Sequence, residues 1–181
     1  NTQVYHRNVE NWLAWTPENG IWSASNIQNV ESKGIDNRTQ ISFFKKKTAF
    51  SIVFWHSYNS TIRKSGDLTG KYLIYVAPFS YGTNCSFRFK KVSLLIQQNY
   101  QSWRFLTADN SDFLDPYTVW NIILKGNHKF GNIFFEINNL FNKNYETVAN
   151  YPMPLRNARL GIMLKINKSL FKSKSLNNKN P

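Results

Sequence analysis

The feature that most constrains this chain is a period-two alternation of apolar and polar residues, which recurs in long runs. From Phe50 to Tyr58, and again from Val92 to Tyr100, every second residue is mostly apolar or aromatic. Successive side chains of a β-strand point to opposite faces of a sheet, so this pattern predicts strands with one apolar and one largely polar face. Helical periodicity is hard to find in the sequence. The chain is therefore predicted to be all-β.

We expect about eight strands in an antiparallel up-and-down meander. Their approximate ranges are 3–14, 24–42, 48–60, 72–87, 92–105, 116–128, 132–143 and 157–167. Several exceed the roughly five to six residues typical of globular strands and match the roughly 9–11 that cross a bilayer at a tilt. The apolar side chains expected to share one face include Phe50, Ile52, Phe54, Thr118, Trp120, Ile122, Leu160 and Ile162.

The connections between these strands alternate in length. Short turns are expected at Phe44–Lys47, Arg88–Lys91 and His128–Gly131, and longer loops at Trp15–Ser23, Thr61–Lys71, Leu106–Asp115 and Lys143–Arg156. Short turns at one end and long loops at the other are typical of outer-membrane barrels. Aromatic residues lie mostly toward the strand ends, where amphipathic rings fit a lipid–water boundary.

Composition leaves two classes of protein open. The 23 Lys and Arg residues outnumber 10 Asp and Glu, giving a net charge of +13, which suits an anionic partner or a solvated basic surface. The chain has no run of about 20 apolar residues, but a barrel strand never produces one. The alternative to a membrane barrel is a soluble antiparallel β module that binds a glycan or a nucleic acid.

No catalytic or metal-binding set is expected. His6, His56 and His128 lack ligand spacing, and the single Cys85 excludes a disulfide framework. The loop that holds Asp109, Asp112 and Asp115 lacks the glycine and the closing glutamate of a calcium loop, and reads as a solvated acidic loop. We predict a protein that is not an enzyme and that needs no cofactor.

The stretch "NNLFNKNYETVANYPMPLRNARLGI", from Asn138 to Ile162, resembles the closing strand–loop–strand of TonB-dependent outer-membrane receptors. Upstream, "NWLAWTPENGIWSASNIQNVESKGID" and "DNSDFLDPYTVWN" resemble a hairpin and a strand start of the same family, in the family's order. The residues of the closing motif that match are Asn139, Leu140, Phe141, Asn142, Tyr145, Glu146, Tyr151, Pro152, Pro154, Arg156 and Gly161. The sequence departs from the family at Leu155, where Gly is usual, and at Ile166, where barrels commonly end on Phe.

The resemblance implies the C-terminal part of a transmembrane β-barrel of about 22 strands. Residues 1–167 would form that part, and residues 168–181 a polar basic tail. Family members import a ferric siderophore, haem or cobalamin, which implies location in the outer membrane of a Gram-negative bacterium. The implied partners are membrane lipid and lipopolysaccharide, an N-terminal plug and further strands outside this chain, TonB acting through that plug, and the metal-chelate or cobalamin ligand; nucleic acid is not among them.

Ligand contacts are expected at the long loops of such a barrel, because loops shape the mouth of the barrel. The loop-adjacent candidates are Trp15, Trp22, Arg104, Tyr151 and Arg156.

Overall fold

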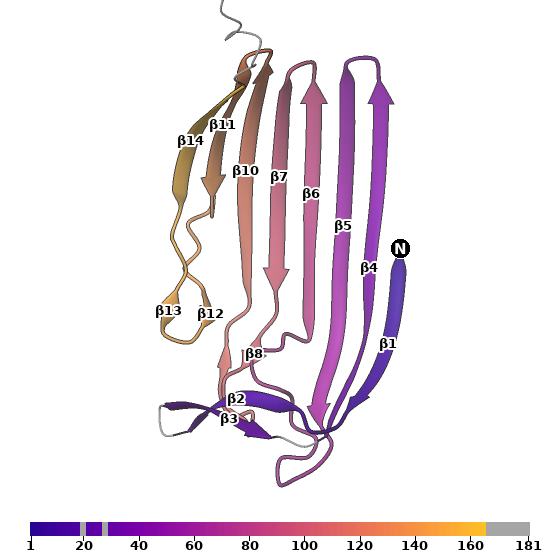
Figure 1. Ribbon diagram of the computed structural model, residues 1–181, viewed down its shortest axis with the longest axis vertical. Coiled ribbons are helices and arrows are strands. Elements are labelled where there is room, and N and C mark those ends of the chain that lie inside the picture. The colour runs from indigo at the N-terminus through magenta and orange to yellow at the C-terminus, as the bar shows by residue number, and fades with distance from the viewer. Residues whose placement is uncertain (19–20, 27–28, 166–181) are drawn as a thin grey trace, which may run out of the picture.

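The computed structural model describes residues 1–18, 21–26 and 29–165, and its regular elements are all strands (Figure 1). The predicted all-β antiparallel meander is confirmed as one eight-stranded sheet in which strands neighbouring in sequence lie side by side. Across the sheet the strands are β1 (Thr2–Val9), β4 (Val30–Lys45), β5 (Thr48–Arg63), β6 (Phe79–Phe89), β7 (Val92–Gln101), β10 (Tyr117–His128), β11 (Gly131–Asn138) and β14 (Asn157–Leu164).

All three predicted short turns are present at one end of this sheet (Figure 1). Each has two central residues: Lys46 and Lys47, Lys90 and Lys91, and Lys129 and Phe130. Lys46 and Lys90 adopt positive φ angles of 49° and 51°. Tight hairpin turns need such left-handed positions because their twist must match that of the flanking strands.

The opposite end carries the long connections and three small two-stranded sheets (Figure 1). These sheets pair β2 (Leu13–Glu18) with β3 (Ile21–Asn26), β8 (Arg104–Phe105) with β9 (Phe113–Leu114), and β12 (Glu146–Val148) with β13 (Tyr151–Pro152). The β2–β3 hairpin crosses this end of the molecule rather than extending the sheet (Figure 1).

Several predicted strand boundaries were wrong at the loop end. The strand expected at 24–42 begins at Val30, because residues 21–26 belong to the separate hairpin, and the strand expected at 3–14 ends at Val9 for the same reason. Alternation continues into extended loop segments there. The strands expected at 72–87, 92–105 and 132–143 lose residues 72–78, 102–105 and 139–143 from the sheet. Ile166 and the predicted tail 168–181 lie outside the described residues.

The register assigns every strand residue to a face. Ile122 lies opposite Ile96 and Ile137, and Ile96 lies opposite Cys85. Residues on this side are mainly apolar or aromatic, and we call it the outer face. The eight apolar-side residues predicted to share a face all lie on it by register. The inner face carries the alternate residues, which are rich in Ser, Asn and Gln.

The molecule has almost no core of its own. Within the described ranges only four apolar residues are buried, namely Val30, Leu73, Leu114 and Val119. A soluble domain of this length buries a large apolar core, because burial supplies most of its stability. Here Phe43, Leu160, Ile162 and many other large apolar side chains remain exposed. This pattern does not favour the soluble alternative.

On the inner face, three glycines each lie beneath an aromatic ring from the directly opposed residue. The pairs are Gly34 with Tyr5, Gly82 with Trp55, and Gly161 with Phe134. A Cβ added at Gly82 would lie 2.5 Å from Trp55 Nε1, so only a residue without a side chain leaves space for the indole. The rings therefore cover the glycine backbone across the strands.

We expect this chain, expressed alone, not to form a stable monomer in water. Its edge strands β1 and β14 each have a sheet partner on one side only, and its outer face is apolar. Unpaired edges and exposed apolar patches promote aggregation. Size-exclusion chromatography and far-UV circular dichroism in detergent-free buffer test this. A sharp monomer peak with a cooperative thermal transition would contradict it.

Candidate functional site

The outer face is banded along the strands. Near the loop end, the rings of Phe79, Tyr81 and Tyr100 form a cluster in which Tyr81 and Tyr100 stack at 4.9 Å. Near the turn end, Phe87 and Phe89 are exposed. Between the two bands the outward side chains are smaller, and they include Ile52, Cys85, Ile96 and Ile122. An apolar zone flanked by aromatic girdles is the surface that a barrel presents to lipid.

The inner face carries a polar pocket of about 460 Å³ beneath the connection between β11 and β14. Its lining includes Asn121, Asn138 and an ion pair in which Arg159 Nη2 lies 2.7 Å from Glu136 Oε2. Amides and one ion pair offer hydrogen-bond donors and acceptors to a polar molecule. Sequence reasoning missed this pair. The signal was alternation, which places both residues on the polar side, but their direct pairing follows only from the register of β11 with β14.

The connection from residue 139 to residue 156, here called the closing loop, is organised by Asn139. This residue is 3% exposed, has φ 51° and follows β11 directly. Its Nδ2 donates to the Lys143 carbonyl at 2.8 Å and to the Pro154 carbonyl at 3.2 Å, while its Oδ1 accepts from the Lys143 N–H at 2.8 Å. One side chain thus joins both ends of the loop. Asn tolerates the left-handed conformation better than most residues, which suits it to this position.

The other residues of the family-like motif surround Asn139. Leu140 donates its N–H to the Trp120 carbonyl at 2.8 Å, and the Phe141 ring meets Trp120 edge-on at 6.1 Å. Asn142 accepts from the Arg156 N–H at 2.9 Å. Each contact attaches the closing loop to a strand or to its own far end. The motif therefore fixes the position of the closing loop at the end of the sheet.

Arg104 connects this loop to another. It is only 2% exposed, and its Nη2 donates to the Glu146 carbonyl at 2.8 Å. Its guanidinium carbon lies 5.3 Å from the centre of the Tyr117 ring, which in turn lies 4.4 Å from that of Tyr145. Burial lowers the pKa of the Arg104 guanidinium from its ordinary value. Through these contacts Arg104 holds β8 against the closing loop.

The β2–β3 hairpin packs onto the loop that follows β5. Ala14 and Val76 pack against the buried pair Val30 and Leu73. The ring of Trp22 lies 5.8 Å from that of Tyr75, whose N–H donates to the Phe105 carbonyl at 2.8 Å. Three loop-end segments are thus held together. Sequence reasoning missed Tyr75, which it placed inside a strand.

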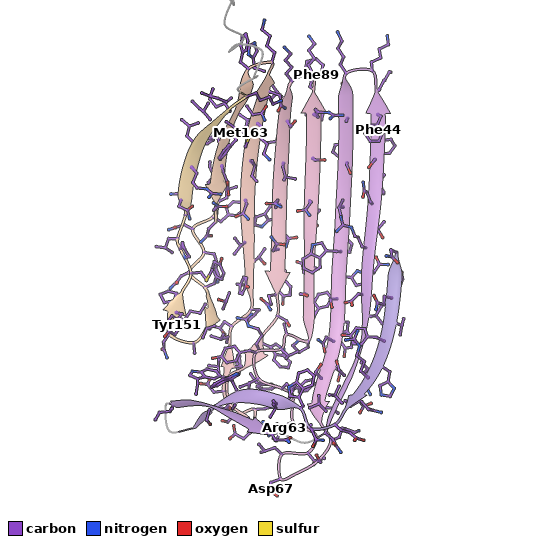
Figure 2. All side chains as sticks on the ribbon, in the orientation of Figure 1. Phe44, Arg63, Asp67, Phe89, Tyr151 and Met163 are labelled. Carbon is purple, nitrogen blue, oxygen red and sulfur yellow. The ribbon has the colours of Figure 1, made fainter. Side chains whose placement is uncertain are left out.

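Of the five predicted ligand-contact residues, four are exposed and one is buried. Trp15 and Trp22 are exposed on the β2–β3 hairpin, at 64% and 44%. Tyr151, 71% exposed, lies on the closing loop (Figure 2). Arg156 lies on the same loop and is also exposed. Arg104 is buried and bonds to the closing loop. Four of the five therefore present surface to solvent.

The acidic loop between β8 and β9 satisfies its own carboxylates. Hydrogen bonds from Thr107 and Ser111 hold the pKa of Asp109 at about 2, and Asp112 Oδ1 accepts from the Phe113 N–H. No group of three or more His, Cys, Asp or Glu side chains placed to hold a metal ion occurs among residues 1–18, 21–26 and 29–165. The same part of the chain contains no helix long and apolar enough to cross a membrane.

The fold is similar to that of solved iron and siderophore receptors. The ferric yersiniabactin uptake receptor FyuA from Yersinia pestis matches with a TM-score of 0.68 at 13% identity, over 88% of this chain and 25% of its own. The siderophore receptor PiuA from Acinetobacter baumannii matches with a TM-score of 0.71 at 14% identity, over 89% and 25%. The FrpB iron transporter from Neisseria meningitidis matches with a TM-score of 0.61 at 17% identity, over 89% of this chain and 28% of its own.

These likenesses establish the fold and the extent of the match. This chain has the fold of part of a receptor of this kind, and it spans about a quarter of the length of those structures. No protein-family model matches the chain, and no curated protein matches it in sequence.

Replacing Asn139 with Ala should destabilise the folded sheet by about 2 kcal/mol or more, because buried partners lose their hydrogen bonds. Ala also resists a positive φ, whereas Asn139→Gly removes the same bonds without that strain. We therefore expect both variants to unfold at lower urea concentration in micelles, Ala more so. Exposed Asn144→Ala is the control. Unchanged stability of Asn139→Gly would show that the side-chain bonds contribute nothing.

Proposed function

We propose that this chain is the C-terminal barrel portion of a TonB-dependent outer-membrane receptor of a Gram-negative bacterium. In the complete receptor the eight strands form part of the wall, with the outer face against lipid and lipopolysaccharide. The inner face lies toward an N-terminal plug, through which TonB delivers energy. The receptor binds and imports a scarce metal chelate.

The observation that carries this proposal is the single open sheet with an apolar exposed face and a polar face. Such a sheet is complete only when further strands pair with β1 and β14 and lipid covers the outer face. The alternating turn lengths, the aromatic bands and the likeness in fold to three iron or siderophore receptors agree with it.

A ferric siderophore is the ligand class that we favour over haem and cobalamin. FyuA is a ferric yersiniabactin uptake receptor, PiuA is a siderophore receptor and FrpB is an iron transporter. The exposed loop-end residues Trp15, Trp22, Tyr151 and Arg156 suit such a ligand. Aromatic faces contact the flat rings of a chelator, and a guanidinium attracts a negatively charged complex.

The complete receptor should restore growth of receptor-deficient cells on limiting iron supplied as a siderophore. Uptake of radiolabelled ferric siderophore should depend on TonB, because the ligand is carried inward against its gradient. Parallel assays with haem and with cobalamin, in the same cells with and without TonB, identify the ligand class. TonB-independent uptake, or no uptake of any of the three, would overturn the proposal.

Two neighbouring isoleucines offer a matched test of which face meets lipid. Ile122 lies on the outer face and Ile123 on the inner face, opposite Glu136. Arginine at the bilayer midplane costs a barrel about 2–4 kcal/mol, whereas lumen positions tolerate it. Ile122→Arg should therefore reduce the folding yield of the complete receptor in lipid vesicles, and Ile123→Arg should not. Equal yields for the two variants would contradict the assignment of the faces.

A further inference from the structure

The turn end of the sheet carries a dense set of cations. The basic rim, as we call it, consists of Lys45, Lys46, Lys47, Arg88, Lys90, Lys91 and Lys129. All seven are exposed, and they lie on or beside the three two-residue turns. Figure 2 shows nitrogen-tipped side chains extending beyond the turns, past the labelled Phe44 and Phe89.

Carboxylates do not balance this charge. No Asp or Glu lies within five residues of a central turn residue in the sequence. The ion pairs among the described residues all involve Glu31 or Glu136, and the basic rim takes part in none of them. Seven uncompensated cations repel one another, so an anionic partner stabilises their arrangement.

Apolar surface lies directly beside the basic rim on the outer face. Phe43, Phe87 and Phe89 are exposed there, and Lys90 Nζ lies 5.1 Å from the centre of the Phe89 ring. Lys129 Nζ lies similarly, 4.7 Å from that of Phe130. Long basic side chains commonly lay their stems along apolar surface and keep the amine at a polar boundary.

An apolar hollow of about 380 Å³ opens on the same side. Lys91 and His128 border it, and its lining includes Ile133, Ile162 and Leu164. Gly126 lies among these residues and contributes no side chain, which leaves space between the strands. A hollow that accepts hydrocarbon therefore adjoins amines that accept phosphate.

We propose that the basic rim binds the phosphate groups of anionic phospholipids, with an acyl chain in the adjoining hollow. This inference rests on the proposed function, since it places the turn end at a membrane boundary. Each lysine near an anionic membrane surface strengthens the binding of the protein to that membrane about fivefold. Single-stranded nucleic acid fits less well. Phe43, Phe87 and Phe89 are continuous with the apolar side chains of the outer face and do not form an isolated stacking platform.

The test is a titration of the detergent-solubilised complete receptor with short-chain phosphatidylglycerol, in which native mass spectrometry measures lipid adducts. Phosphatidylcholine with the same chains shows the part due to the acyl groups, and added salt shows the electrostatic part. We expect phosphatidylglycerol to bind more tightly than phosphatidylcholine. Inorganic phosphate at equal concentration should not displace it, because phosphate lacks the acyl chain.

Lys47→Gln with Lys91→Gln should weaken phosphatidylglycerol binding about tenfold or more and leave phosphatidylcholine unchanged. Neither residue has a positive φ, so the turns tolerate both changes. Lys71→Gln with Lys143→Gln removes the same charge at the loop end and should have no effect. If the first pair impairs folding, Lys91→Gln alone carries the test, because Lys91 borders the hollow.

Equal binding of the two lipids, or an equal loss in both variant pairs, would overturn the inference. Tighter binding of a single-stranded oligonucleotide to the basic rim would also overturn it. A receptor that imports its chelate normally but shows no lipid preference refutes this inference alone. A receptor that keeps the preference but imports nothing refutes only the proposed function.

Discussion

Between β4 and β5 the backbone ladder pairs residues without a slip, from Val30 opposite Arg63 to Lys45 opposite Thr48. The two-residue turn at its end holds that register, and two further turns do the same for β6–β7 and β10–β11. A shift of one residue would send every outward side chain of a strand inward. The division into an apolar and a polar face, the aromatic bands and the basic rim all depend on this register.

Sequence sufficed for the sheet because a period of two is a local signal, repeated along Phe50–Tyr58 and Val92–Tyr100. The three short turns were predicted for the same reason, since their lysines interrupt the alternation. The loop end did not, because residues 21–26 alternate as a strand would but pair with β2 rather than with β5. Asn139 was identified from a resemblance, and its hydrogen bonds to Lys143 and Pro154 depend on a loop path that no alternation encodes.

Two side chains that bond to backbone carbonyls tie distant segments of the loop end together. Arg104 does so across 42 positions of sequence to Glu146, and Asn139 does so to Pro154. Backbone carbonyls are present whatever residue supplies them, so the intervening positions can vary without loss of these bonds. Such loops combine a fixed frame with replaceable surface residues. Trp15 and Tyr151 are exposed residues of this kind, and loops of this kind commonly carry binding residues on a fixed frame.

The three glycines beneath Tyr5, Trp55 and Phe134 allow these rings to lie close to the backbone of the inner face. An aromatic ring that lies flat across the neighbouring strand extends sideways instead of outward, so these bulky inward groups project little from the inner face. At these three points the height of the inner surface above the backbone is determined by residues that have no side chain. A Cβ at any of the three glycines would displace its ring and thicken the sheet on its inner side.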